Sequence, residues 1–212
     1  DFNHGQFPGY GNGPFFVFVD YQHHEAWKPI TARPEFSASA LPATRKKLVA
    51  GESLRIIAYG DSITAGGEAS DPKLIFWERW ADALRAKYPK AKVETINGAT
   101  GGDATVQGLQ RLQGKVLSQT PDLVLIGFGM NDHNRGGPTP TAFAGNLSTI
   151  IDRIRSATGA EIVLFSAFPP NPKWHYGTHN MAAYAEATEQ VAREKRCAFA
   201  DVFNLWQQCA AR

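Results

Sequence analysis

Three short loops hold the residues whose types and spacing could carry out chemistry. The first, residues 60–67 (Gly-Asp-Ser-Ile-Thr-Ala-Gly-Gly), places Ser62 between an apolar run and an amphipathic stretch. A serine at such a strand-to-helix turn lies near a helix N-terminus, where free backbone N–H groups point towards a developing anion. The same residues would also suit a glycine-flanked turn in which Ser62 only caps the helix. Taken alone, this loop leaves both interpretations open.

Two further loops could supply hydrogen-bond donors to such an anion. Residues 96–103 are rich in glycine, and the backbone N–H of a glycine can approach a substrate oxygen with no Cβ in the way. Residues 129–132 (Gly-Met-Asn-Asp) contain Asn131, whose neutral amide can donate without titrating. Each of the two loops could equally be an ordinary tight turn.

In combination and in this order, the sequences GDSITAGG, NGATGGD and GMND resemble the first three blocks of the SGNH hydrolases, also called GDSL esterases and lipases. The resemblance covers roughly residues 54–206. It implies that Ser62 is the nucleophile of a serine hydrolase. It also implies an oxyanion hole made by the backbone N–H groups of Ser62 and Gly102 and by the side chain of Asn131. Asp61, beside the nucleophile, is expected to orient the turn.

The choice of Gly102 depends on its place within the second block. It stands immediately before Asp103 and five places after Asn97, as the glycine of that block usually does in the family. Gly98 and Gly101 do not meet both conditions. Asp103 itself is expected to anchor the loop.

The fourth block of the family, an Asp-x-x-His that supplies the general base and its orienting partner, is missing from this sequence. Asp201 follows the last predicted strand, but Asn204 stands three residues later. We therefore expect the chain to end just before its base and to be a weak or inactive esterase as written, because a serine hydroxyl without an imidazole is a poor nucleophile. His133 and His179 lie in loops that should border the pocket, where they could contact substrate or solvent or replace the base.

Strands and helices that alternate along the chain would position these loops. Apolar runs and helical spacing predict, in order, strand 54–59, helix 76–87, strand 92–96, helix 106–117, strand 122–128, helix 141–157, strand 161–166, helix 181–195 and strand 198–202. This order predicts an α/β fold, a three-layer α/β/α sandwich with a parallel sheet, which is the flavodoxin-like fold of the SGNH hydrolases. In such folds the chemistry lies at the carboxyl ends of the strands, and all three loops follow strands.

The domain organisation follows from where this pattern starts. Residues 1–42 show no sustained period, and we interpret them as an irregular N-terminal extension with a strand at 15–19, or as the tail of a preceding β-rich module. Residues 43–212 would form the hydrolase domain. A length of 212 residues with 43% hydrophobic content favours one substantial core.

Composition excludes several classes of partner. The 22 basic and 20 acidic residues give a formal charge of +2, which argues against a nucleic-acid partner. No apolar run is long enough to span a membrane. Cys197 and Cys209 lack the spacing of a zinc site, and whether they form a disulfide stays open. We expect no metal or organic cofactor and a secreted or periplasmic location, and oligomeric state is not predicted.

The expected reaction is hydrolysis of a small-molecule or carbohydrate ester through an acyl-enzyme. The aromatic residues Trp27 and Trp174 would suit a sugar, by analogy with family members that deacetylate carbohydrates. One alternative is a non-catalytic or truncated module that binds esters or glycans, which the missing Asp-x-x-His favours. Another is a flavodoxin-like binder of nucleotides or phosphate, with residues 98–102 around the phosphate. Against it, the sequence has neither Gly-x-Gly-x-x-Gly nor Gly-x4-Gly-Lys-Ser/Thr.

Overall fold

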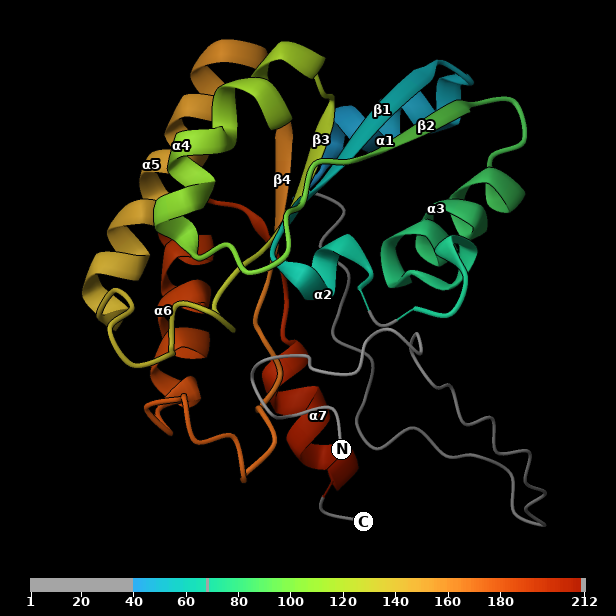
Figure 1. The fold of residues 1–212 in the computed structure, drawn as a ribbon. Coiled ribbons are helices and arrows are strands. Elements are labelled where there is room, and N and C mark those ends of the chain that lie inside the picture. Colours follow the sequence, from blue (N-terminus) through green and yellow to red (C-terminus); the bar gives the residue numbers. More distant parts are fainter. Residues whose placement is uncertain (1–39, 68, 211–212) are drawn as a thin grey trace, which may run out of the picture. The chain divides into compact units, whose positions relative to one another are not determined.

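Parallel strands form a single sheet in the computed structural model, which describes residues 40–67 and 69–210 (Figure 1). The strands are β1 (Ser53–Gly60), β2 (Lys92–Asn97), β3 (Leu123–Gly127), β4 (Glu161–Phe165) and β5 (Ala198–Ala200). They lie in the order β2-β1-β3-β4-β5, and each neighbouring pair is parallel. The predicted α/β fold with a parallel sheet is confirmed.

Helices connect these strands. They are α1 (Pro42–Ala50), α2 (Ser62–Ala65), α3 (Phe76–Lys87), α4 (Thr105–Lys115), α5 (Pro140–Thr158), α6 (Met181–Glu194) and α7 (Val202–Ala210), with short 3₁₀ turns η2 (Pro72–Leu74) and η3 (Leu117–Gln119). The helices predicted from apolar spacing correspond to α3, α4, α5 and α6, and the ends agree to within two residues. Burial of one apolar face explains this agreement, since each of these helices packs on the sheet.

Helix α1 was not predicted, because its burial does not follow a helical apolar pattern. Thr44 and Leu48 are its buried residues. Its start and stop residues fit a helix, with Pro42 in the first turn and Gly51 in a left-handed conformation (φ 74°) at the end. The carboxylate of Glu161 accepts hydrogen bonds from the backbone N–H groups of the first turn of α1, including that of Thr44 at 2.7 Å. These bonds fix α1 to the start of β4.

Two apolar cores lie on opposite faces of the sheet. Alternate residues of a strand point to opposite faces. Accordingly, Ile57 and Tyr59 of β1 pack in the core shared with α4, α5 and α6, whereas Ile56 and Ala58 pack in the core shared with α1 and α3. All residues of β3 are buried, as expected for a central parallel strand. The predicted three-layer arrangement is therefore present in the described residues (Figure 1).

Strand β4 is covered unevenly. Ile162 and Leu164 are fully buried in the core with α5 and α6, whereas Val163 and Phe165, on the other face, are only half-buried. Val163 and Phe165 line an apolar cavity of about 620 Å³ that is bounded by residues of α3 and α7.

Several predictions concern residues outside the described part of the chain. Most of the irregular segment 1–42, with its strand at 15–19, falls there, and so do Trp27 and the histidines His4, His23 and His24. Within the described residues, no helix is both long and apolar enough to cross a membrane.

Candidate active site

Ser62 is the first residue of α2, and its side chain is exposed. The strand before it ends at Gly60, which pairs in register with Gly127 of β3. A Cβ at Gly60 would lie 2.1 Å from the Gly127 oxygen, so only glycine lets β1 run this close to β3 before the chain turns. Asp61 then caps α2, because its Oδ1 accepts from the Ile63 N–H at 3.0 Å. The exposed hydroxyl thus lies at the carboxyl end of a central strand.

The glycine-rich residues 96–103, after β2, lie against Ser62. The Thr100 N–H donates to the carbonyl of the last β1 residue at 3.0 Å, and a Cβ at Gly101 would lie 3.8 Å from the Ser62 Cβ. The Asp103 N–H closes a turn on the Thr100 oxygen at 3.3 Å. Gly102 is the third residue of that turn, and its φ of +80° is a conformation that favours glycine. No atom lies within 4 Å of the position that a Cβ at Gly102 would take. Gly102 therefore borders open space next to the nucleophile.

Asn131 lies in the turn after β3 and is bonded to the glycine-rich residues. Its Nδ2 donates to the backbone oxygen of Asp103 at 3.0 Å. A side-chain amide has two N–H groups, so one remains for another acceptor. The next residue, Asp132, is fully buried, and its Oδ1 accepts from the Thr105 N–H (2.9 Å) and hydroxyl (2.5 Å) at the start of α4. These bonds fix the turn that carries the amide.

Asp61 joins the first of these loops to the third. It is 2% exposed, and this burial raises its pKa from 3.8 to about 6. Hydrogen bonds from the backbone N–H groups of Ile63, Thr64 and Met130 lower the pKa, and the nearby Asp132 carboxylate raises it. Because Met130 precedes the candidate oxyanion amide, the bonds of Asp61 are consistent with its predicted role in orienting the turn.

The structure thus brings the three predicted loops together at the carboxyl ends of β1, β2 and β3. Ser62, Gly102 and Asn131 each lie in one of them. Among the described residues, the backbone N–H groups of Ser62 and Gly102 donate to no other group. The catalytic roles of the three residues stay predictions.

The histidine nearest in sequence to Asn131 is part of the core and not of the pocket rim. His133 is fully buried, its Nδ1 is hydrogen-bonded to the Met130 oxygen, and its Nε2 has no hydrogen-bond partner among the described residues. Burial lowers the pKa of His133 and so favours its neutral form. No hydrogen bond therefore joins its ring to Ser62. His179 is exposed, with a left-handed φ of 59°.

Asp201 caps α7. Its Oδ2 accepts from the side-chain amide of Asn204 at 2.6 Å, and its Oδ1 accepts from the Asn204 N–H at 3.1 Å. Within residues 40–67 and 69–210, His, Cys, Asp and Glu side chains form no group that could hold a metal ion. Cys197 is half-buried and Cys209 exposed, and both are free thiols.

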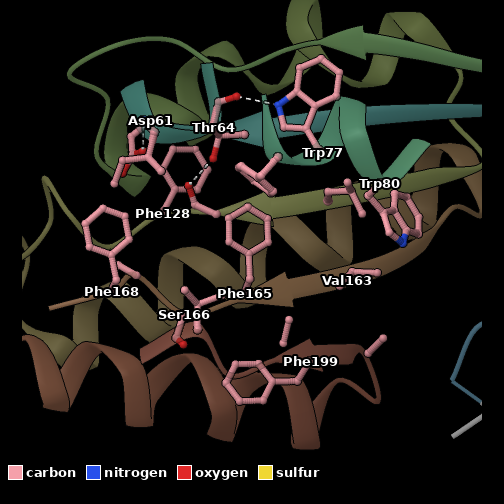
Figure 2. A pocket seen from close by; sticks show the side chains of 18 of the residues that line it. Asp61, Thr64, Trp77, Trp80, Phe128, Val163, Phe165, Ser166, Phe168 and Phe199 are labelled. Atoms are coloured by element: carbon pink, nitrogen blue, oxygen red, sulfur yellow. Dashed lines mark hydrogen bonds between the residues drawn. The ribbon is translucent and has the colours of Figure 1, made fainter. Parts of the chain in front are cut away.

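An apolar cavity beside the Ser62 turn was not predicted from the sequence (Figure 2). Asp61, Ile63 and Thr64 line it on one side, although Ser62 does not. Thr64 is held by two hydrogen bonds, from its hydroxyl to a β3 carbonyl (3.2 Å) and from the Trp77 indole to its own carbonyl (2.7 Å). The wall holds several aromatic side chains, among them Phe76, Trp77, Trp80, Phe165, Phe168 and Trp206. The residues come from several elements, so no local pattern could indicate the cavity.

Comparison with known sequences gives one family. Residues 58–212 match the GDSL-like lipase/acylhydrolase family. An arylesterase of Vibrio mimicus is 40% identical over 124 residues, which are 56% of this chain and 58% of the arylesterase. Esterase TesA of Pseudomonas aeruginosa is 28% identical over 153 residues, 70% of each chain. The match thus spans less than two thirds of the arylesterase.

Solved structures share the fold. A lipase/acylhydrolase from Enterococcus faecalis has a TM-score of 0.61 and 27% identity, over 75% of this chain and 80% of the other. The acetylxylan esterase Axe2 from Geobacillus stearothermophilus has a TM-score of 0.63 and 20% identity, over 75% of this chain and 81% of Axe2. A two-domain esterase active on acetylated mannans has a TM-score of 0.69 and 21% identity, over 84% of this chain and 45% of the esterase.

Proposed function

Because the chain belongs to the GDSL-like lipase/acylhydrolase family, we propose that it hydrolyses carboxylic esters with Ser62 as the nucleophile. The observation that carries the proposal is the set of hydrogen bonds that holds the three loops together around this exposed serine. The Ser62 hydroxyl attacks the ester carbonyl, and the tetrahedral intermediate collapses to an acyl-serine as the alcohol leaves. Water then attacks the acyl-serine and releases the acid.

The negative oxygen of the intermediate would accept hydrogen bonds from the backbone N–H groups of Ser62 and Gly102 and from the side chain of Asn131. All three donors are neutral and are already held in place by their loops, so little reorganisation is needed when the charge develops. The support lies in the N–H groups of Ser62 and Gly102, which donate to no other described group, and in the second N–H of Asn131.

We further propose that these 212 residues hydrolyse esters slowly. A serine hydroxyl needs a base to remove its proton, and no imidazole among the described residues is hydrogen-bonded to Ser62. The carboxylate of Asp201 is already bonded to Asn204. In the best-studied serine hydrolase, an oxyanion hole and substrate binding without the triad leave roughly a thousand- to ten-thousand-fold acceleration over water. Similar residual activity is expected here.

For the substrate we propose a carbohydrate O-acetyl ester. The fold shared with esterases of acetylated xylan and mannan is one support. Another is an aromatic pair in the 171–180 loop, in which the rings of Trp174 and Tyr176 lie 5.2 Å apart and the Trp174 indole donates to Asn134, in the turn of Asn131, at 2.9 Å. Aromatic faces are common in the walls of ligand sites. A polysaccharide substrate would also agree with the predicted secreted or periplasmic location.

A fluorophosphonate probe, mapped by mass spectrometry, tests the proposed nucleophile. The probe should label Ser62 slowly, because no imidazole among the described residues is hydrogen-bonded to this serine, and Ser62→Ala should abolish the label. Ser70→Ala, at an exposed serine that follows α2, should leave the labelling unchanged. Labelling at another serine would refute the assignment. Binding of acetylated xylo-oligosaccharides with neither labelling nor turnover would instead support the non-catalytic ester- or glycan-binding module.

A further inference from the structure

We propose that the 171–180 loop, between β4 and α6, positions the side chain of Asn131, and that the contact between Trp174 and Asn134 fastens it there. Asn131 then lies between two supports, α4 on one side and the 171–180 loop on the other. This role depends on the ester hydrolysis proposed above, in which Asn131 donates to the oxyanion.

Asn134 connects the two loops. Its N–H donates to the Asn131 oxygen at 3.2 Å, so it belongs to the same turn as the proposed oxyanion donor. It also forms an isolated antiparallel bridge with Gly177. Its side-chain Oδ1 accepts from the Trp174 indole N–H at 2.9 Å. The side chain of Asn134 thus binds the 171–180 loop, and its backbone lies opposite Gly177.

Two backbone hydrogen bonds, one on either side of Asn134, form this bridge. The Arg135 N–H donates to the Tyr176 oxygen at 2.8 Å, and the Thr178 N–H donates to the His133 oxygen at 3.0 Å. Backbone bonds restrict the relative position of two segments more closely than contacts between mobile side chains do, because they fix several dihedral angles at once. The residues that follow Asn131 are therefore held in register with the 171–180 loop.

The contact between Gly177 and His133 leaves no room for a side chain at position 177. A Cβ at Gly177 would lie 2.6 Å from the His133 Nε2, and both residues are buried. The other ring nitrogen of His133 is bonded to the Met130 oxygen, immediately before Asn131. A shift of the 171–180 loop would press on the imidazole and so displace the turn.

The opposite side of Asn131 is attached to α4. Its own amide is bonded to Asp103, and the next residue, Asp132, is bonded twice to Thr105. With this side fixed, the 171–180 loop decides how the rest of the turn lies. Misplacement of a reacting or donating group by about 1 Å can cost about 100-fold in rate, so a second support has a measurable effect.

Hydrogen–deuterium exchange of the whole chain tests the support without requiring turnover. Trp174→Phe keeps an aromatic ring and removes the indole donor, and Asn134→Ala removes the acceptor. In each variant the amides of residues 129–135 should exchange at least about fivefold faster, with Arg135 most affected because its N–H crosses between the loops. Lys173→Ala, at the exposed neighbour of Trp174, should leave them unchanged. Unchanged exchange in both Trp174→Phe and Asn134→Ala would overturn the inference.

Phenylboronic acid, which forms a tetrahedral adduct with a serine, tests whether the support acts through Asn131. Trp174→Phe should bind it about tenfold more weakly than the unmodified chain. In an Asn131→Ala background the same change should cause no further weakening, because the donor is already gone. Equal weakening in both backgrounds would show that the loop acts elsewhere and would refute the proposed positioning role. If the unmodified chain fails to bind phenylboronic acid, the proposed hydrolase function fails, and the exchange measurement alone decides whether the loops support each other.

Discussion

Replacing Asp61 by asparagine should stabilise the protein near neutral pH. Burial raises the pKa of this carboxyl from 3.8 to about 6, so at pH 7 the folded chain holds a charge that it accommodates poorly. The difference between these two pKa values corresponds to about 3 kcal/mol of unfolding free energy. Asparagine removes the charge and keeps an oxygen for the Ile63 N–H. The asparagine side chain has one hydrogen-bond acceptor fewer than the aspartate, and this loss cancels about 1 kcal/mol of the gain. The net gain expected at pH 7 is about 2 kcal/mol.

Because the pKa of Asp61 is raised in the folded state, the stabilisation by Asp61→Asn depends on pH. Protonated Asp61 is favoured in the folded state, so its contribution to stability is fully present below pH 3.8 and is lost as the pH rises to about 6. Urea denaturation at pH 4 to 8 should therefore show an advantage of Asp61→Asn that grows with pH and levels off above pH 6. Asp71→Asn, at an exposed aspartate that caps η2, controls for the change of capping group. An advantage that is flat or shrinks with pH would refute the reasoning.

Three further outcomes are expected. Gly127→Ala should lower the free energy of unfolding by about 2–3 kcal/mol, because its Cβ would lie 1.9 Å from the Phe165 ring. Gly114→Ala, whose Cβ would have no atom within 4 Å, should raise the free energy of unfolding slightly, and urea denaturation of both variants checks this. Asn131→Ala should reduce kcat for an aryl acetate by about 100- to 1,000-fold in folded protein, and a smaller loss would remove it from the oxyanion hole. His133→Ala should destabilise the fold and slow the hydrolysis of short aryl esters about tenfold in folded protein, because it removes the contact of the 171–180 loop with the turn that carries Asn131; complete loss of turnover would make His133 the base.

Regular elements and the three loops could be predicted because their causes are local. Helices α3 and α5 bury one apolar face, and that face appears in the sequence as a period. The loops follow strands, and the carboxyl ends of parallel strands meet at one edge of a sheet. From these two facts alone, Ser62 and Asn131 could be expected near each other.

Features that depend on contacts between distant segments could not be predicted. His133 looked like a residue of the pocket rim, but its burial depends on Gly177, which lies far along the chain. Helix α1 was missed because its N-terminus is held by Glu161 and not by an apolar stripe. The hydrogen bond from the Trp174 indole to Asn134 corresponds to no sequence motif either.

The paired glycines at the ends of β1 and β3 differ in how much sequence change each can accept. A Cβ at Gly127 meets the ring of Phe165, a side chain, so a smaller residue at position 165 could make room for it. A Cβ at Gly60 meets the backbone oxygen of Gly127 at 2.1 Å, and every amino acid carries that oxygen. No second substitution can relieve that collision. During evolution, position 127 could therefore change in company with a neighbour, whereas position 60 must stay glycine for as long as β1 and β3 keep this register.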